Sequence, residues 1–164
     1  MAVNAGGAPV STFPTAGETV AAWAATFARY GIVPGQTPPA EAASRVRSSA
    51  IRSILLDTLD GWLARGSTET ALNLLEILRQ IDPDPFSAEV RRSLVAKDRD
   101  ELNRLAERSD WSARHIGVAL ACAESPELTE VVRRSLLLRI VGISPNDFRL
   151  FLEVAELGSF TQAA

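Results

Sequence analysis

Apolar residues recur along this 164-residue chain every three or four positions, and prolines or glycines interrupt the pattern at short intervals. This spacing puts apolar side chains on one face of an α-helix, and proline cannot continue a helix beyond its first turn. No segment alternates apolar and polar residues as a strand does, and turn pairs such as Asn-Gly are absent. The pattern therefore predicts an all-α chain with helices of about 10 to 15 residues.

The amino-terminal half is predicted to contain two helices. The first begins at Thr15 and ends before Gly31, because a glycine suits the position that follows a helix. The second is a single long helix from Pro39 to Gly66. Its predicted apolar stripe is Val46, Ala50, Ile54, Leu55, Leu59, Trp62 and Leu63.

The second half is predicted to contain shorter helices that begin at capping residues or at prolines. The predicted starts are Ser67, Asp84-Pro85, Asp98, Ser112, Ser125-Pro126 and Ser144-Pro145. The helix after Ser67 carries leucine or isoleucine at three-residue intervals, at Leu72, Leu75, Leu78 and Ile81. Short turns between helices of this length predict antiparallel hairpins.

Three regions are expected along the chain. Residues 1–14, rich in Gly, Ala and Pro, are expected to form a mobile, dispensable tail. Residues 15–142 are expected to form stacked helical hairpins, because similar segments recur about 30 residues apart, near the period of tetratricopeptide-like repeats. The predicted core leucines are Leu55, Leu59, Leu75, Leu78 and Leu105. Residues 144–164 form a third region with a different pattern.

Charge and hydropathy exclude several classes of protein. The net charge is −3 and the pI is near 5.2, which gives no overall attraction to nucleic acid or to an acidic membrane. The longest apolar stretch is far shorter than the roughly 20 residues that a membrane helix needs. The amino-terminal residues lack the features of a secretory signal. A cytoplasmic protein with no membrane partner is expected.

Candidate catalytic or metal-binding residues are few. His115 and Cys122, the only His and Cys, lie seven residues apart, whereas a zinc site needs three or four protein ligands. Ordinary packing is therefore the interpretation for both. Asp82 and Asp84, each beside a proline, are interpreted as a turn and a helix cap. No group of acid, base and nucleophile is evident, so neither an enzyme nor a cofactor is expected.

Arginines gather in two segments of the chain. One group is Arg45, Arg47 and Arg52, and the other is Arg133, Arg134 and Arg139. Such groups contact phosphate backbones in nucleic-acid-binding proteins. The acidic pI and the lack of interleaved aromatic residues favour solvated helix faces instead.

Two segments resemble a region of bacterial serine/threonine kinases. The stretch LLEILRQIDPDPFSAEVRRSLVAKDRDELNRLA, residues 74–106, and the preceding residues 28–62 are similar to the tetratricopeptide-like region that follows the kinase domain. No glycine-rich phosphate loop, His-Arg-Asp or Asp-Phe-Gly motif is present. This resemblance implies a non-catalytic scaffold that binds a protein partner through helical repeats.

The stretch NDFRLFLEVAELGSFTQAA, residues 146–164, resembles the first part of the LysR-type helix-turn-helix. Gly158 suits the end of one helix, and Ser159 with Gln162 forms a capping box for the next. The positions that match the family are Leu150, Phe151, Val154, Ala155, Glu156, Gly158, Ser159, Phe160, Thr161, Ala163 and Ala164. A tetratricopeptide hairpin, which also places a glycine, an aromatic residue and an alanine across its turn, is the alternative interpretation.

The LysR-type resemblance implies an incomplete DNA-binding unit. In that family the helix that enters the major groove follows the alanine pair, which here is Ala163-Ala164. A truncated product or a fused reading frame is therefore expected, with Arg149 as the only basic residue of this segment. DNA is expected as a partner only if the motif were completed. The leading hypothesis is a fragment of a transcriptional regulator, the alternative is an interaction scaffold, and an enzyme ranks lowest.

Overall fold

A computed structural model describes residues 15–143 of the chain. The expected tail at residues 1–14 and the LysR-like segment at residues 144–164, with all of its matched positions, lie outside the described residues. Within residues 15–143 the structure contains eight α-helices and no strand, which confirms the all-α prediction. The helices are α1 (Ala16–Arg29), α2 (Pro39–Arg47), α3 (Arg52–Arg65), α4 (Thr68–Ile81), α5 (Pro85–Ala96), α6 (Arg99–Glu107), α7 (Ile116–Glu124) and α8 (Glu130–Ile143).

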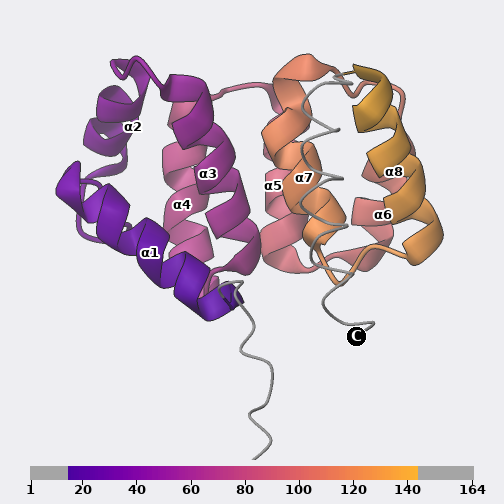
Figure 1. Cartoon of the computed structure of the whole chain (residues 1–164), viewed down its shortest axis with the longest axis horizontal. Coiled ribbons are helices and arrows are strands. Elements are labelled where there is room, and N and C mark those ends of the chain that lie inside the picture. Colours follow the sequence, from indigo (N-terminus) through magenta and orange to yellow (C-terminus); the bar gives the residue numbers. More distant parts are fainter. Residues whose placement is uncertain (1–14, 144–164) are drawn as a thin grey trace, which may run out of the picture.

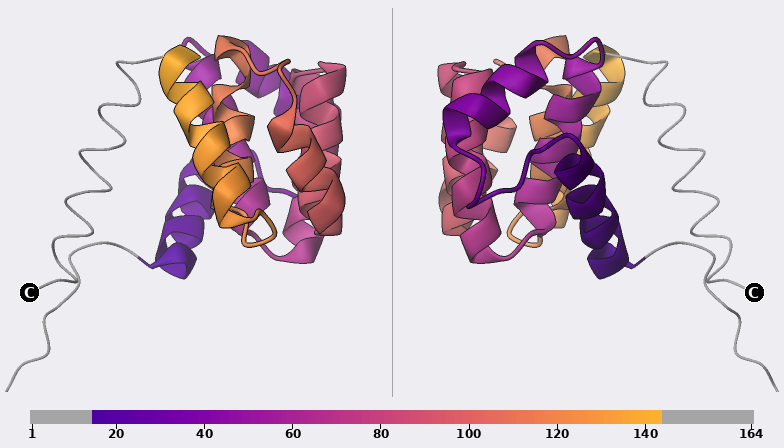
Figure 2. Two further views of the ribbon diagram at one scale, coloured as in Figure 1. Left: turned by 90° about the vertical axis from the view of Figure 1, so that its right-hand side faces the viewer. Right: turned by 90° about the vertical axis from the view of Figure 1, so that its left-hand side faces the viewer.

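Six of these helices form two layers (Figures 1 and 2). One layer contains α3, α7 and α8, and the other contains α4, α5 and α6, so that α3 faces α4, α7 faces α5 and α8 faces α6. At one end of the layers, α1 packs on α3 and α2 packs on α4. The most extensive contact joins α3 to α7, which are far apart in the sequence. The helices after α4 therefore extend the two layers beside α3 and α4.

The predicted helix starts in the middle of the chain are confirmed. At Thr15, Ser67, Asp84 and Asp98 a side-chain oxygen accepts a hydrogen bond from the backbone N–H three residues later, at 2.9 to 3.3 Å. Such a bond satisfies one of the amide groups that a helix start leaves without an intrahelical partner. At the end of α1, Gly31 adopts a left-handed conformation with φ of 71°, as the glycine at this position predicted.

The prediction of one long helix from Pro39 to Gly66 is wrong, because residues 48–51 separate α2 from α3. The Ser48 hydroxyl donates to the backbone oxygen of Arg45 at 3.1 Å, and the Ser49 hydroxyl accepts from the backbone N–H of Ile51 at 3.2 Å. Such local bonds compete with the helical pattern. The break lets α2 pack on α4 while α3 turns toward α7. It also leaves Ile54, a member of the predicted stripe, 60% exposed.

The predicted inward face of α4 is partly wrong. Leu72 is 55% exposed and Leu75 is only half-buried, whereas Leu78 and Ile81 are buried as predicted. The helix buries more than one side because α2, α3 and α5 all pack on it. Its buried face is therefore wider than a three-residue period shows, and it comprises Ala71, Leu74, Ile77, Leu78 and Ile81.

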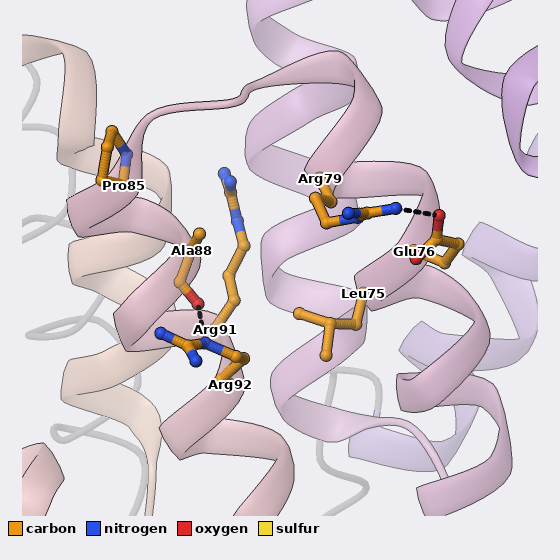
Figure 3. A pocket seen from close by; sticks show the side chains of 7 residues that line it. All are labelled: Leu75, Glu76, Arg79, Pro85, Ala88, Arg91 and Arg92. Carbon is orange, nitrogen blue, oxygen red and sulfur yellow. Dashed lines mark hydrogen bonds and ion pairs between the residues drawn. The ribbon is translucent and has the colours of Figure 1, made fainter.

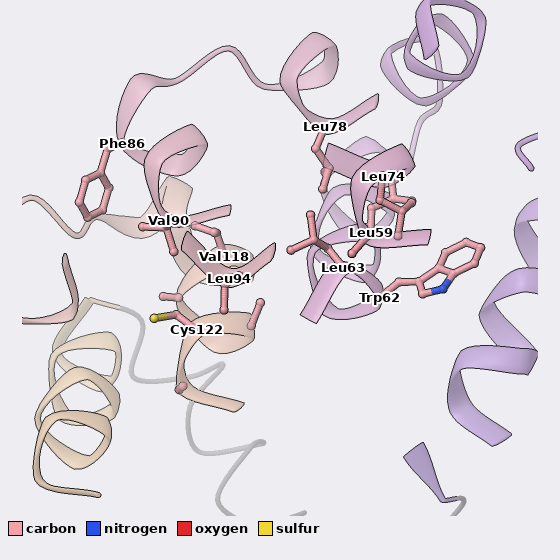
Figure 4. Close-up of a cluster of buried hydrophobic side chains, with 14 of the residues drawn as sticks. Leu59, Trp62, Leu63, Leu74, Leu78, Phe86, Val90, Leu94, Val118 and Cys122 are labelled. Atoms are coloured by element: carbon pink, nitrogen blue, oxygen red, sulfur yellow. The ribbon is translucent and has the colours of Figure 1, made fainter. Parts of the chain in front are cut away.

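The hydrophobic core extends from one end of the two layers to the other (Figure 4). On one side Leu59, Trp62, Leu63, Leu74 and Leu78 of α3 and α4 lie together, and on the other Phe86, Val90, Leu94, Val118 and Cys122 of α5 and α7 do so. Of the predicted core leucines, the ones that are fully buried are Leu59, Leu78 and Leu105. Leu55, like Leu75, packs against the core and keeps part of its surface exposed.

The last two helices begin later than predicted. A short 3-10 helix, Ala113–His115, precedes α7, and α8 begins at Glu130 rather than beside Pro126. The carboxamide oxygen of Asn103 on α6 accepts from the backbone N–H and from the hydroxyl of Thr129, each at 3.1 Å. This contact fixes the start of α8 against α6. No helix within the described part of the chain is long and apolar enough to span a membrane.

Candidate functional site

The first arginine group donates hydrogen bonds to backbone oxygens at the carboxyl ends of helices. Arg47 and Arg52 donate to the backbone oxygens of Gln80 and Ile81, the last residues of α4, at 2.7 and 3.2 Å. Arg45 donates to the backbone oxygen of Tyr30, at the end of α1. The last carbonyl groups of a helix have no intrahelical partner and carry partial negative charge, so a guanidinium group stabilises them.

The second arginine group repeats this arrangement. Arg133 donates to the backbone oxygen of Ala123 at 2.8 Å, near the end of α7. Arg139 donates to the backbone oxygens of Ala106, Glu107 and Arg108, at 3.2, 2.8 and 2.7 Å, and so closes α6. Arg134 is the exposed member of the group. The interpretation as solvated helix faces agrees with the exposure of Arg45, Arg47, Arg52 and Arg134, whereas Arg133 and Arg139 are half-buried. Sequence spacing did not show the bonds of these arginines to carbonyl groups, because it does not show which carbonyl groups lie nearby.

His115 lies in a buried cluster that the sequence did not reveal. Its Nδ1 atom lies 3.2 Å from the hydroxyl of Ser112, and its Nε2 atom lies 3.2 Å from a carboxylate oxygen of Asp84. The backbone N–H of Ser112 also donates to Nδ1 at 3.2 Å. The Nε of Arg114 also donates to the Nε2 atom at 3.1 Å, so this ring nitrogen contacts both Arg114 and Asp84.

This serine, histidine and aspartate arrangement acts as a structural clasp. Nδ1 has one lone pair, and the backbone N–H of Ser112 already occupies it, so the ring is not free to take a proton from the hydroxyl. Asp84 also accepts from the backbone N–H of Ser87 at 2.9 Å and pairs with Arg114 at 2.8 Å. Burial acts to raise the pKa of Asp84, but these partners lower it below its usual value. The clasp joins the residues before α7 to the start of α5.

Cys122 and His115 are both buried, in agreement with ordinary packing. Burial raises the pKa of the Cys122 thiol to about 12, so the reactive thiolate is suppressed. Across residues 15–143 no three His, Cys, Asp or Glu side chains are grouped so that they could hold a metal ion. Asp82 and Asp84 occupy the turn and the cap that the sequence indicated.

A groove between α4 and α5 is the candidate binding site (Figure 3). It encloses a cavity of about 380 Å³. Leu75, Pro85 and Ala88 give it an apolar surface, while charged side chains stand at its edges. All of the lining residues except Arg91 are exposed or half-buried, so the groove opens to solvent. The residues that line it are Leu75, Glu76, Arg79, Pro85, Ala88, Arg91 and Arg92.

Arg91 forms the buried wall of the groove. In Figure 3 its side chain rises through the space between α4 and α5. Its Nε and one terminal nitrogen bind both oxygens of Asp60 on α3, at 2.7 and 2.9 Å, and the other terminal nitrogen binds Asp82 at 3.0 Å. Burial acts to lower the pKa of Arg91, but these contacts raise it above its usual value. The guanidinium group therefore stays charged and joins α3, α5 and the turn before α5.

Two other arginines stand on opposite walls of the groove. Arg79 on α4 pairs with Glu76 at 2.8 Å, and its side chain is 67% exposed. Arg92 on α5 is exposed, and its Nε lies 3.4 Å from the backbone oxygen of Ala88. Among the described residues Arg92 forms no ion pair. The groove edge thus carries two exposed arginines, and the charge of Arg79 is balanced by Glu76.

Comparisons of this chain with models of protein families, with curated proteins and with solved structures found no match. The resemblances to the LysR-type helix-turn-helix and to the kinase-associated repeats therefore stay predictions. Sequence reasoning pointed to the segment that forms α4 and α5 but did not single out its groove. The Arg91-Arg92 pair beside the proline-marked turn at Pro85 was the signal that could have indicated it.

Proposed function

We propose that residues 15–143 form a non-catalytic module that binds a protein partner in the groove between α4 and α5. The observation that supports this most is the combination of an apolar floor with an open edge that carries exposed charged side chains. Exposed apolar surface beside charged residues is typical of sites for protein partners. Leu72, one turn before Leu75 on α4, is a further exposed apolar side chain on this helix, with 55% of its surface exposed.

Helical hairpins of the tetratricopeptide kind bind partners through surfaces of this type, and residues 74–106, which carry that resemblance, include both walls of the groove. We also propose that the hairpins of residues 15–143 are stacked as in tetratricopeptide-like repeats. The contact of α3 with α7 closes the hairpins on one another, so the partner would lie on an outer groove and not inside an open superhelix.

A blocked groove tests the proposal. In the Ala88→Phe variant a large ring would fill the cavity, and the new residue is compatible with the helical backbone of α5. Ala25→Phe, the same change at an exposed position of α1, is the matched control. We expect proteins captured by cross-linking from a lysate to be lost with Ala88→Phe and retained with Ala25→Phe. Identical sets captured by the parent and both variants would refute a role for the groove.

For the whole chain we propose a regulator in which this module is joined to the LysR-like segment at residues 146–164. The similarity of that segment is its support. Residues 146–164 match the part of the family's motif that precedes the recognition helix, so these residues by themselves are not expected to supply the base-edge contacts of sequence-selective DNA binding. A gel-shift assay checks this, because salt-resistant and sequence-selective binding by residues 1–164 would contradict the proposal. A chain extended by a LysR-type second half is expected to bind.

A further inference from the structure

The chemistry of the groove edge indicates what kind of partner fits. We infer that the groove between α4 and α5 receives an amphipathic α-helix with carboxylate side chains on either side of an apolar row. This inference rests on the proposed function of the groove. It adds the secondary structure and the charge of the partner.

The shape of the groove favours a helix as the occupant. Two packed helices form its walls, and side chains of a third helix fit into the groove between such neighbours. Leu75 lies on one wall, and Ala88 on the other wall leaves room because its side chain is small. A helix with apolar residues at every third or fourth position would bury Leu75.

The charges favour carboxylates on the partner. Arg79 and Arg92 stand on opposite walls, so one carboxylate on each flank of a bound helix would reach one of them. The ion pair of Arg79 with Glu76 is exposed, and such pairs contribute little, so Arg79 can exchange its partner. The nearby carboxylate of Glu89 already pairs with Arg104 and Arg108, at 3.2 and 3.3 Å. Arg92 therefore remains available.

The buried wall supports this assignment. Arg91 also lines the groove, but Asp60 and Asp82 already bind its guanidinium group from inside the protein. Its charge is therefore balanced before any ligand arrives, and an anion deep in the groove would meet those two carboxylates. At the groove edge, Arg92 keeps a positive charge that no ion pair within residues 15–143 balances. A helix that places apolar residues in the groove and acidic ones at its edges matches this distribution.

Three fluorescent probe peptides of about 18 residues, five helical turns, test the inference. The acidic probe has a leucine row flanked by glutamates, the basic probe has lysines in place of the glutamates, and the third has the acidic composition without the row. We expect the acidic probe to bind with the highest affinity by fluorescence anisotropy. Raising the salt to about 1 M should weaken this binding, because charges are then screened within roughly 3 Å.

Charge-reversal variants locate the binding. Arg92→Glu is expected to weaken binding of the acidic probe by about fivefold or more, since one exposed ion pair is lost and a repulsion replaces it. Arg134→Glu makes the same change of charge on α8 and is expected to alter the affinity less than about twofold. Ala88→Phe is expected to abolish binding, whereas Ala25→Phe is not.

The outcomes separate this inference from the proposed function. If the acidic and basic probes bind equally and Ala88→Phe blocks both, the groove binds helices and the inferred acidic partner is wrong. If the acidic probe binds Ala88→Phe or Arg92→Glu as it binds the parent chain, the groove is not its site. If none of the probes binds, the inference of an amphipathic helix is overturned.

Discussion

Replacing Arg139 tests the finding that arginines close the ends of helices. Its guanidinium group on α8 donates to three backbone oxygens at the end of α6, at 2.7 to 3.2 Å. Arg139→Ala removes all three bonds and the positive charge beside the helix end. We expect the free energy of unfolding to fall, because these carbonyl groups lose a charged donor and α8 loses an anchor to α6.

The magnitude follows from the geometry. Hydrogen bonds with a charged partner contribute about 1.5 to 3 kcal/mol when buried, and a cation at a helix end adds about 0.3 to 1 kcal/mol. Arg139 is only half-buried, so water recovers part of this, and we expect a loss of about 1.5 to 2 kcal/mol. For a domain of this size that loss lowers the Tm by about 5 to 8 °C.

Urea unfolding followed by circular dichroism measures the effect. Arg134→Ala, the same substitution at an exposed position of the same helix, is the matched control and should change the free energy of unfolding by less than about 0.5 kcal/mol. Arg139→Lys keeps the charge without the planar fork, so we expect about half of the loss. Equal unfolding free energies for Arg139→Ala and Arg134→Ala would refute the capping role.

Three further substitutions test the packing. Burial raises the pKa of Asp60, and Arg91 offsets part of that rise, so Arg91→Met should cost about 3 to 5 kcal/mol at pH 7. Because the raised folded pKa favours protonation, this cost should shrink as the pH falls toward about 4, and a pH-independent cost would contradict the account. Trp62→Phe should change the free energy of unfolding by less than about 1 kcal/mol in urea titrations. The reason is that the Trp62 Nε1 is buried with no hydrogen-bond partner within residues 15–143, so no hydrogen bond is lost. A loss above about 3 kcal/mol would show that the indole nitrogen matters. Gly117→Ala should lower the free energy of unfolding by about 1 to 3 kcal/mol, because the new Cβ would lie 2.9 Å from a backbone atom of α3. Gly61→Ala is the control, since its new Cβ would lie 3.3 Å from the nearest atom, which belongs to a side chain. Equal thermal stabilities of the two variants would contradict this prediction.

Local sequence signals predicted the fold class and most helix starts. A capping residue acts on the backbone within its own turn, so Ser67, Asp84 and Asp98 could be interpreted without knowledge of the tertiary structure. The break between α2 and α3 could not be predicted in this way. Neither proline nor glycine marks it, and the separate packing of the two helices on α4 and α7 favours it.

The candidate site depended on contacts between distant segments. Arg91 meets Asp60 from 31 positions away, and the groove exists only because α4 and α5 pack side by side. Likewise, the pattern of α4 indicated an apolar face but not which of its leucines the neighbouring helices would cover. Leu72 consequently remains exposed. Periodicity assigns residues to a helix face, whereas tertiary packing decides which face becomes a binding surface.

The most direct test of the proposed interaction site is a titration of the ¹⁵N-labelled chain with the acidic amphipathic probe, followed by NMR. We expect the amide signals of α4 and α5 to shift most, especially those near Leu75, Ala88 and Arg92, while the signals near Arg134 on α8 stay in place. The same titration of Ala88→Phe should leave the spectrum unchanged. Shifts centred on α8 or on α1, or equal shifts in the Ala88→Phe variant, would contradict the assignment of the groove between α4 and α5 as the binding surface.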